Sequence, residues 1–132
     1  MKEFKTIVPF PPYRYRIYVL FTDSLEGSAD NLANQGFLAK NHGIADDGTT
    51  GAFSVRLPNQ SASFVVLKYH ALVNDIVHEC YHAVCNMFKW IGAAHEEEIF
   101  AYHLDYLVRQ VRSDQEKTLR KLEKALDKSK EV

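Results

Sequence analysis

The alternation of hydrophobic and polar residues predicts three β-strands in the first 69 residues. Residues 13–22, YRYRIYVLFT, are rich in aromatic and β-branched side chains and stop before an aspartate and a serine, which is typical of a strand. Residues 52–57 and 63–69 have the same character, and the turn-forming segment 58–60, PNQ, lies between them. We therefore expect these two strands to form a hairpin.

Apolar residues spaced three and four apart predict three helices. The first covers residues 24–39, and a loop rich in Gly and Asp follows it at 41–51. The second lies within residues 66–91, which contain no Pro or Gly, and the third covers 93–112 after Gly92. The apolar positions of the second helix are Val73, Ile76, Val77, Cys80, Val84 and Phe88. The sequence therefore predicts an α+β fold in the order β-α-β-β-α-α, with a small sheet beside the second helix and a long C-terminal helix.

The two ends of the chain differ from its central part. Three prolines make residues 1–12 an extended arm that cannot join a helix. A heptad-like apolar stripe runs through residues 104–126, and residues 113–132 carry mixed charge without Pro or Gly. The stripe is short and Gln115 interrupts it, which favours a solvated helix over a helix that binds a partner or a second copy. We expect one domain at 13–112, with the arm before it and a charged helical extension at 113–132 after it.

The composition and charge of the chain argue against several classes of function. A chain of 132 residues that is 46% hydrophobic suffices for one domain with a single core. The net charge of −1, with no basic cluster along the sequence, gives no reason to expect nucleic acid or an anionic membrane as a partner. No apolar run approaches the length of a membrane-spanning helix, and the N-terminal residues lack the apolar core of a signal peptide. These features predict a cytoplasmic protein.

The strongest chemical signal is an HExxH motif, HECYH, at residues 78–82 of the second predicted helix. Residues four apart lie on the same face of a helix, so His78 and His82 can present two imidazole nitrogens to one cation. Glu79 lies about 100° around the helix from His78, beside the metal rather than on it. This is the place of a general base that activates a zinc-bound water. The motif therefore predicts a zinc hydrolase site.

The two cysteines of this helix do not suggest a ligand role. Cys80 and Cys85 are five residues apart and point about 140° from each other, which excludes a disulfide within the helix. Cys80 also points away from the face that carries the two histidines. Both are expected to be small buried hydrophobic residues.

A catalytic zinc site has three protein ligands and a fourth position for water. Residues 95–102, HEEEIFAY, lie in the third predicted helix, which a short turn joins to the HExxH helix. The spacing alone leaves Glu96, Glu97 and Glu98 as alternatives for the third ligand. Such an acidic run also suits an exposed helix N-terminus, where it complements the helix dipole.

These motifs resemble those of the gluzincin metallopeptidases, in which HExxH is followed by a helical Glu-x-x-Ala pattern whose glutamate is the third zinc ligand. Residues 98–102, EIFAY, match this pattern, and the resemblance covers residues 64–108. It is greatest to small zincins of phages and mobile elements and more distant to ImmA/IrrE-type peptidases. The resemblance implies a minimal zincin-like fold, His78, His82 and Glu98 as zinc ligands, and Glu79 as general base. It also implies that an edge strand beside the active helix, one of those between 52 and 69, can pair with extended substrate.

On this basis we expect a zinc-dependent hydrolase of peptide bonds whose substrate is a peptide or protein. The donor that stabilises the oxyanion is left open among Tyr69, Tyr102, His95 and His103. One alternative is a zinc-binding scaffold without catalysis, in which the metal joins the two helices. Another is a metal-free interaction module that uses the helix at 104–126 to contact a partner.

Overall fold

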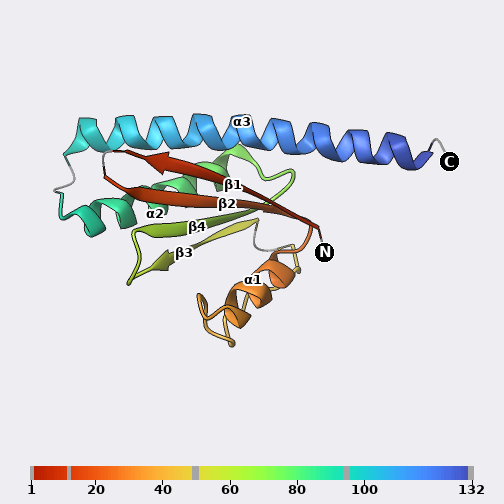
Figure 1. Ribbon diagram of the computed structural model, residues 1–132, viewed down its shortest axis with the longest axis horizontal. Coiled ribbons are helices and arrows are strands. Elements are labelled where there is room, and N and C mark those ends of the chain that lie inside the picture. The colour runs from red at the N-terminus through yellow and green to blue at the C-terminus, as the bar shows by residue number, and fades with distance from the viewer. Residues whose placement is uncertain (1, 12, 49–50, 94–95, 131–132) are drawn as a thin grey trace.

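The computed structural model describes residues 2–11, 13–48, 51–93 and 96–130. Its elements follow the order β-β-α-β-β-α-α, which confirms the predicted α+β class and adds one strand at the N-terminus (Figure 1). They are β1 (Glu3–Phe10), β2 (Tyr15–Thr22), α1 (Leu25–Asn34), β3 (Ala52–Leu57), β4 (Ala62–Lys68), α2 (Val73–Ile91) and α3 (Glu97–Lys130).

The four strands form one mixed sheet in the order β1-β2-β4-β3. β3 and β4 pair antiparallel, with Val55 opposite Phe64, which confirms the predicted hairpin. β2 and β4 are parallel neighbours in the middle of the sheet, with Val19 opposite Val65. Within the described residues, β3 therefore pairs on one side only and is an edge strand.

The extended arm predicted at residues 1–12 contains strand β1. The segment is extended, but it pairs antiparallel with β2 along its full length. Pro9 lacks the N–H that a central strand needs, and this proline is tolerated because β1 is the other edge of the sheet. Val8 and Phe10 point into the core and are buried. The first strand is therefore part of the domain core.

The sheet separates two hydrophobic clusters. Alternate residues of the central strands point to opposite faces, so that Val19 and Val65 contact the α2 and α3 side, whereas Leu20 and Val66 contact the α1 side. The helices α2 and α3 lie together on one face, and the short α1 lies on the other (Figure 1). The fold is thus a three-layer arrangement with the sheet in the middle.

Two features fix the helices that carry the predicted site. Gly92 ends α2 with φ of +70°, a left-handed conformation that glycine adopts without strain, and its N–H bonds the Lys89 carbonyl. α3 then runs without a break for 34 residues, so the expected extension at 113–132 continues the same helix as far as Lys130. Its far end passes beyond the sheet (Figure 1), where Leu126 is 61% exposed.

No helix among the described residues has the length and apolar character needed to span a membrane.

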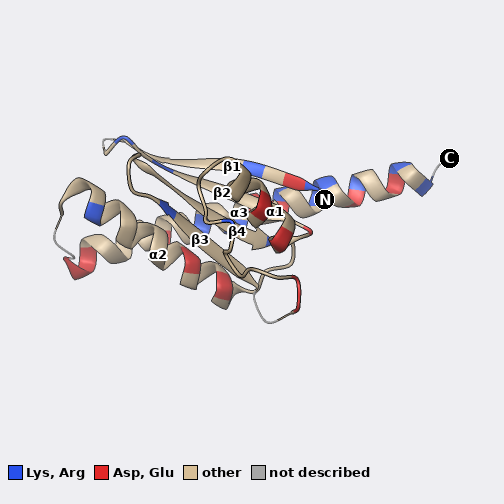
Figure 2. Ribbon diagram, turned by 90° about the horizontal axis from the view of Figure 1, so that it is seen from below, with Lys and Arg blue, Asp and Glu red and all other residues tan. Residues whose placement is uncertain are grey.

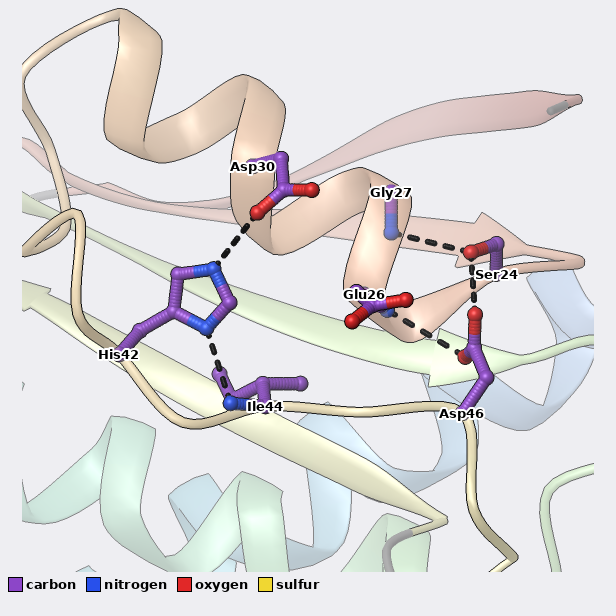
Figure 3. Close-up of polar contacts among 7 residues, drawn as sticks. All are labelled: Ser24, Glu26, Gly27, Asp30, His42, Ile44 and Asp46. Atoms are coloured by element: carbon purple, nitrogen blue, oxygen red, sulfur yellow. Dashed lines mark hydrogen bonds and ion pairs between the residues drawn. The ribbon is translucent and has the colours of Figure 1, made fainter.

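The loop after α1 is fastened to that helix by two polar residues (Figure 3). Asp46 accepts a hydrogen bond from Ser24 Oγ at 2.5 Å and another from the N–H of Leu25 at 2.8 Å. Ser24 is itself the N-cap of α1, because its Oγ accepts from the N–H of Gly27. His42 Nδ1 accepts from the N–H of Ile44, so its other ring nitrogen is free to donate to the carboxylate of Asp30 at 2.8 Å.

We expect Asp46→Asn to lower the melting temperature in a pH-dependent way. The hydrogen bond from Ser24 is the main reason why the pKa of Asp46 is below its ordinary value in the folded protein. A depressed carboxyl pKa stabilises the fold above the unfolded pKa, and this contribution is lost as the pH falls through the folded pKa. The melting temperatures of wild type and variant should therefore differ at neutral pH and converge in acid. Asp127→Asn, at the exposed end of α3, is the control, and a difference that does not change with pH would contradict the assignment.

Candidate metal centre

The HExxH residues lie in the first half of α2. One face of this helix packs on the sheet through buried residues, namely Ile76, Cys80, Ala83, Val84 and Met87. Because four residues make slightly more than one turn, His78 and His82 fall together on the opposite, exposed face. The side chain of His78 is 68% exposed, so a ligand can reach the pair directly from solvent.

The two imidazoles converge on one point. Their Nε2 atoms are 3.2 Å apart, and their ring planes meet at 76°. Zinc–nitrogen bonds of about 2.0–2.1 Å at a tetrahedral angle place two ligand nitrogens about 3.3–3.4 Å apart. The histidine pair is thus arranged at the spacing that two zinc ligands need.

Glu79 lies beside the pair but is buried. The residue is 8% exposed, and its Oε1 is 4.0 Å from His78 Nε2. Its side chain keeps 11% of its exposure, so the carboxylate lies largely out of solvent beside the two imidazoles. A largely buried carboxylate next to two exposed imidazoles is the arrangement that a base beside a bound cation would need.

Glu79 is on the flank of α2 that faces the edge strand. Asp75, one turn earlier on the same flank, lies against Gly51, where an added Cβ would come within 2.5 Å of the Asp75 carboxylate. Gly51 directly precedes β3, and α2 also contacts β3 and β4. Of the two strands that the sequence left open, β3 is therefore the edge strand near the motif, whereas β4 is internal.

The third expected ligand does not lie with the histidines in this structure. Glu97 and Glu98 form the exposed first turn of α3, and no group of three or more His, Cys, Asp or Glu within the described ranges is arranged to hold a metal ion. Phe100 nevertheless contacts Tyr81 of the HExxH motif, with ring centroids 5.3 Å apart. Helical spacing puts Glu97 about 60° and Glu98 about 160° from Phe100, so Glu97 is the residue nearer to α2.

The candidates for an oxyanion donor have other positions. Tyr69 donates its hydroxyl hydrogen bond to the carbonyl of Lys2, and His103 Nδ1 bonds the carbonyl of Ile99 at 2.7 Å. Tyr102 is 72% exposed on α3, and His95 lies outside the described residues. None of the three described candidates therefore contacts the histidine pair.

Cys80 has the predicted role of a small buried hydrophobic residue. Its side chain is fully buried, and the pKa of its thiol is raised to about 12, first by burial and then by the charge of Glu79. Metal ligation requires the thiolate, which this environment disfavours. Both Cys80 and Cys85 are free thiols.

The positions of the histidine pair and of Glu79 on α2 could be predicted from the sequence because they depend only on helical spacing. Comparison of the chain with known protein families, with curated proteins and with solved structures finds no match. The case for a metal centre therefore depends on the residues of this chain and on their geometry.

Proposed function

We propose that this protein is a zinc-dependent peptide-bond hydrolase of the gluzincin type. The observation that carries the proposal is the pair of Nε2 atoms, 3.2 Å apart on two exposed histidines, beside the largely buried carboxylate of Glu79. Spacing and exposure of the histidines fit two ligands of a zinc ion, and the position of Glu79 fits a base beside it.

Each residue has a distinct role in this proposal. His78 and His82 bind zinc, and Glu98 completes the ligand set, as the resemblance implies. The bound zinc would polarise the scissile carbonyl and make an attacking water more acidic. Glu79 accepts the proton of that water at its carboxylate and donates it to the amine nitrogen of the leaving peptide.

The edge strand β3 suggests how a substrate is oriented. A peptide in extended conformation can pair with the free edge of a sheet through backbone hydrogen bonds. β3 offers such an edge on the flank of α2 where Glu79 lies. Backbone pairing would bring a scissile peptide bond near Glu79 without requiring a particular side chain.

Zinc content tests the ligand assignment. We expect near-stoichiometric zinc in the wild type and in Glu96→Ala, but a clear loss in Glu98→Ala, because removal of one of three ligands weakens a zinc site strongly. Glu97→Ala is the matched comparison, since Glu97 is the acidic residue of this turn nearer to α2. Elemental analysis of the four purified proteins gives the answer. A wild-type protein that holds no zinc, even after zinc is supplied, would contradict the proposed function.

A non-catalytic zinc scaffold is the second candidate. The observation that favours it is that Tyr69 and His103, two candidates for the oxyanion donor, hydrogen-bond to backbone carbonyls and not to groups at the histidine pair. A scaffold would bind zinc but would neither bind a hydroxamate, which needs an open coordination position, nor hydrolyse peptides. Hydroxamate binding to the zinc-loaded protein therefore separates the two functions.

A further inference from the structure

A hollow of about 770 Å³ lies at the end of the sheet where the β1–β2 turn and the β3–β4 turn come together. Arg14, Arg16 and Tyr18 line it from one side, and Gln60 and Ser61 line it from the other. None of its described lining residues belongs to α2 or α3. The hollow is thus separate from the histidine pair.

The charge of the hollow is entirely positive. Arg14 and Arg16 both line it, and no Asp or Glu does so among the described residues; Figure 2 shows basic residues at the turn between β1 and β2. Neither guanidinium forms an ion pair or a side-chain hydrogen bond with another described residue. Each guanidinium offers five N–H donors and no acceptor, and the two like charges repel each other. Both arginines are exposed, so an anion in the hollow would replace water at these donors and offset the two like charges.

The backbone of the turn is strained at one of these arginines. Arg14 has φ of +55°, the only positive φ of a non-glycine residue in the described part of the chain. This left-handed conformation is unfavourable for an arginine and would be easy for glycine. Strain of this kind is typical of sites where a side chain is held for a ligand.

Hydrogen bonds between the β1–β2 hairpin and the β3–β4 hairpin hold the walls of the hollow in place. The N–H of Arg16 donates to the carbonyl of Ser61 at 3.0 Å. Beneath them, the hydroxyls of Tyr15 and Ser63 share a buried hydrogen bond. The hollow therefore needs no large rearrangement before it can bind a ligand.

Tyr18 adds an aromatic wall beside the arginines. Its ring stacks on Phe64 at a centroid distance of 5.2 Å, and Lys5 Nζ lies 4.5 Å from its ring centre. Because Phe64 and Lys5 lie against the ring, a flat group attached to the anion would meet the edge of Tyr18. Two arginine forks suit a doubly charged phosphate better than a single carboxylate.

We infer that this hollow binds a phosphate group, with Arg14 and Arg16 holding the phosphate and Tyr18 contacting the ring-bearing group of a phosphate monoester. The proposal is independent of the zinc site. Its two sources of the same chemistry are inorganic phosphate and a nucleoside monophosphate, and adenosine monophosphate serves as the second probe.

Isothermal titration calorimetry at low ionic strength tests the site with both probes. A chelator is present, so that phosphate cannot bind to a metal at the histidine pair. We expect saturable binding, tighter for adenosine monophosphate, which Arg14→Gln and Arg16→Gln each weaken by about tenfold or more, as loss of a charge-assisted hydrogen bond implies. Arg112→Gln, an exposed arginine on α3, is the matched control and should bind as the wild type does.

Arg14→Gly distinguishes a ligand role from a role in the turn. Glycine relieves the positive φ, so we expect the melting temperature to stay the same or rise while phosphate binding is lost. Three results would overturn the inference: no saturable binding of either probe by the wild type, full binding by both glutamine variants, or a lower melting temperature for Arg14→Gly.

Discussion

Glu79→Gln is expected to lower peptide hydrolysis by about 10²–10⁴-fold, the contribution typical of a general acid–base group, and to leave zinc binding intact. Glutamine has nearly the shape of glutamate but cannot accept the proton of the attacking water. The substitution leaves unchanged the histidine Nε2 atoms that are the proposed metal ligands, so the zinc content should not fall. The measurements are kcat on a quenched-fluorescence peptide library and elemental analysis of the same sample.

The same substitution also has an expected effect on stability. Glu79 is 8% exposed, so a neutral amide of nearly the same shape fills its place without a charge that must be desolvated. We therefore expect the melting temperature of the metal-free variant to equal or exceed that of the wild type. Loss of activity together with unchanged or greater stability is the signature of a functional carboxylate. Glu116→Gln, on the exposed side of α3, is the control for the change of charge, and hydrolysis by Glu79→Gln at the wild-type rate would rule out this base.

The parts of the fold that the sequence predicted correctly are those set by local periodicity and turn residues. The spacing of Ile76, Cys80 and Val84 fixes the buried face of α2 and, with it, the exposed face of the two histidines. Gly92 ends that helix because only a left-handed residue can close it there. The β3–β4 hairpin followed in the same way from two strand-like segments around a short turn.

The features that were missed depend on contacts between segments far apart in the chain. β1 was not predicted because it contains Pro9. A proline argues against a strand unless that strand is known to be at the edge of a sheet. The hollow at Arg14 forms where the β1–β2 and β3–β4 hairpins lie side by side. The residue pattern within 13–22 contains no information about that contact. The choice between Glu97 and Glu98 depends on how α3 is rotated about its own axis, and the packing of Phe100 sets that rotation.

Phe88 is the residue on which this packing depends most, and Phe88→Ala is expected to cost about 3–5 kcal/mol of unfolding free energy. Its side chain is 1% exposed and lies against Phe100 and His103 of α3, with ring centroids 5.3 Å and 5.5 Å away. Alanine would leave a cavity at the junction of α2 and α3. A loss of this size is a large part of the about 5–15 kcal/mol that stabilises a typical domain.

Urea denaturation of Phe88→Ala beside Tyr102→Ala measures this effect. Tyr102 is 72% exposed on α3, and its removal should change the unfolding free energy by less than about 0.5 kcal/mol. Zinc affinity should also fall in Phe88→Ala and stay unchanged in Tyr102→Ala. A third ligand on the first turn of α3 can reach the metal only while the α2–α3 junction is in place. If Phe88→Ala lost stability but bound zinc as tightly as Tyr102→Ala, the metal would be held by α2 without the help of α3, and the ligand set with Glu98 would have to be abandoned.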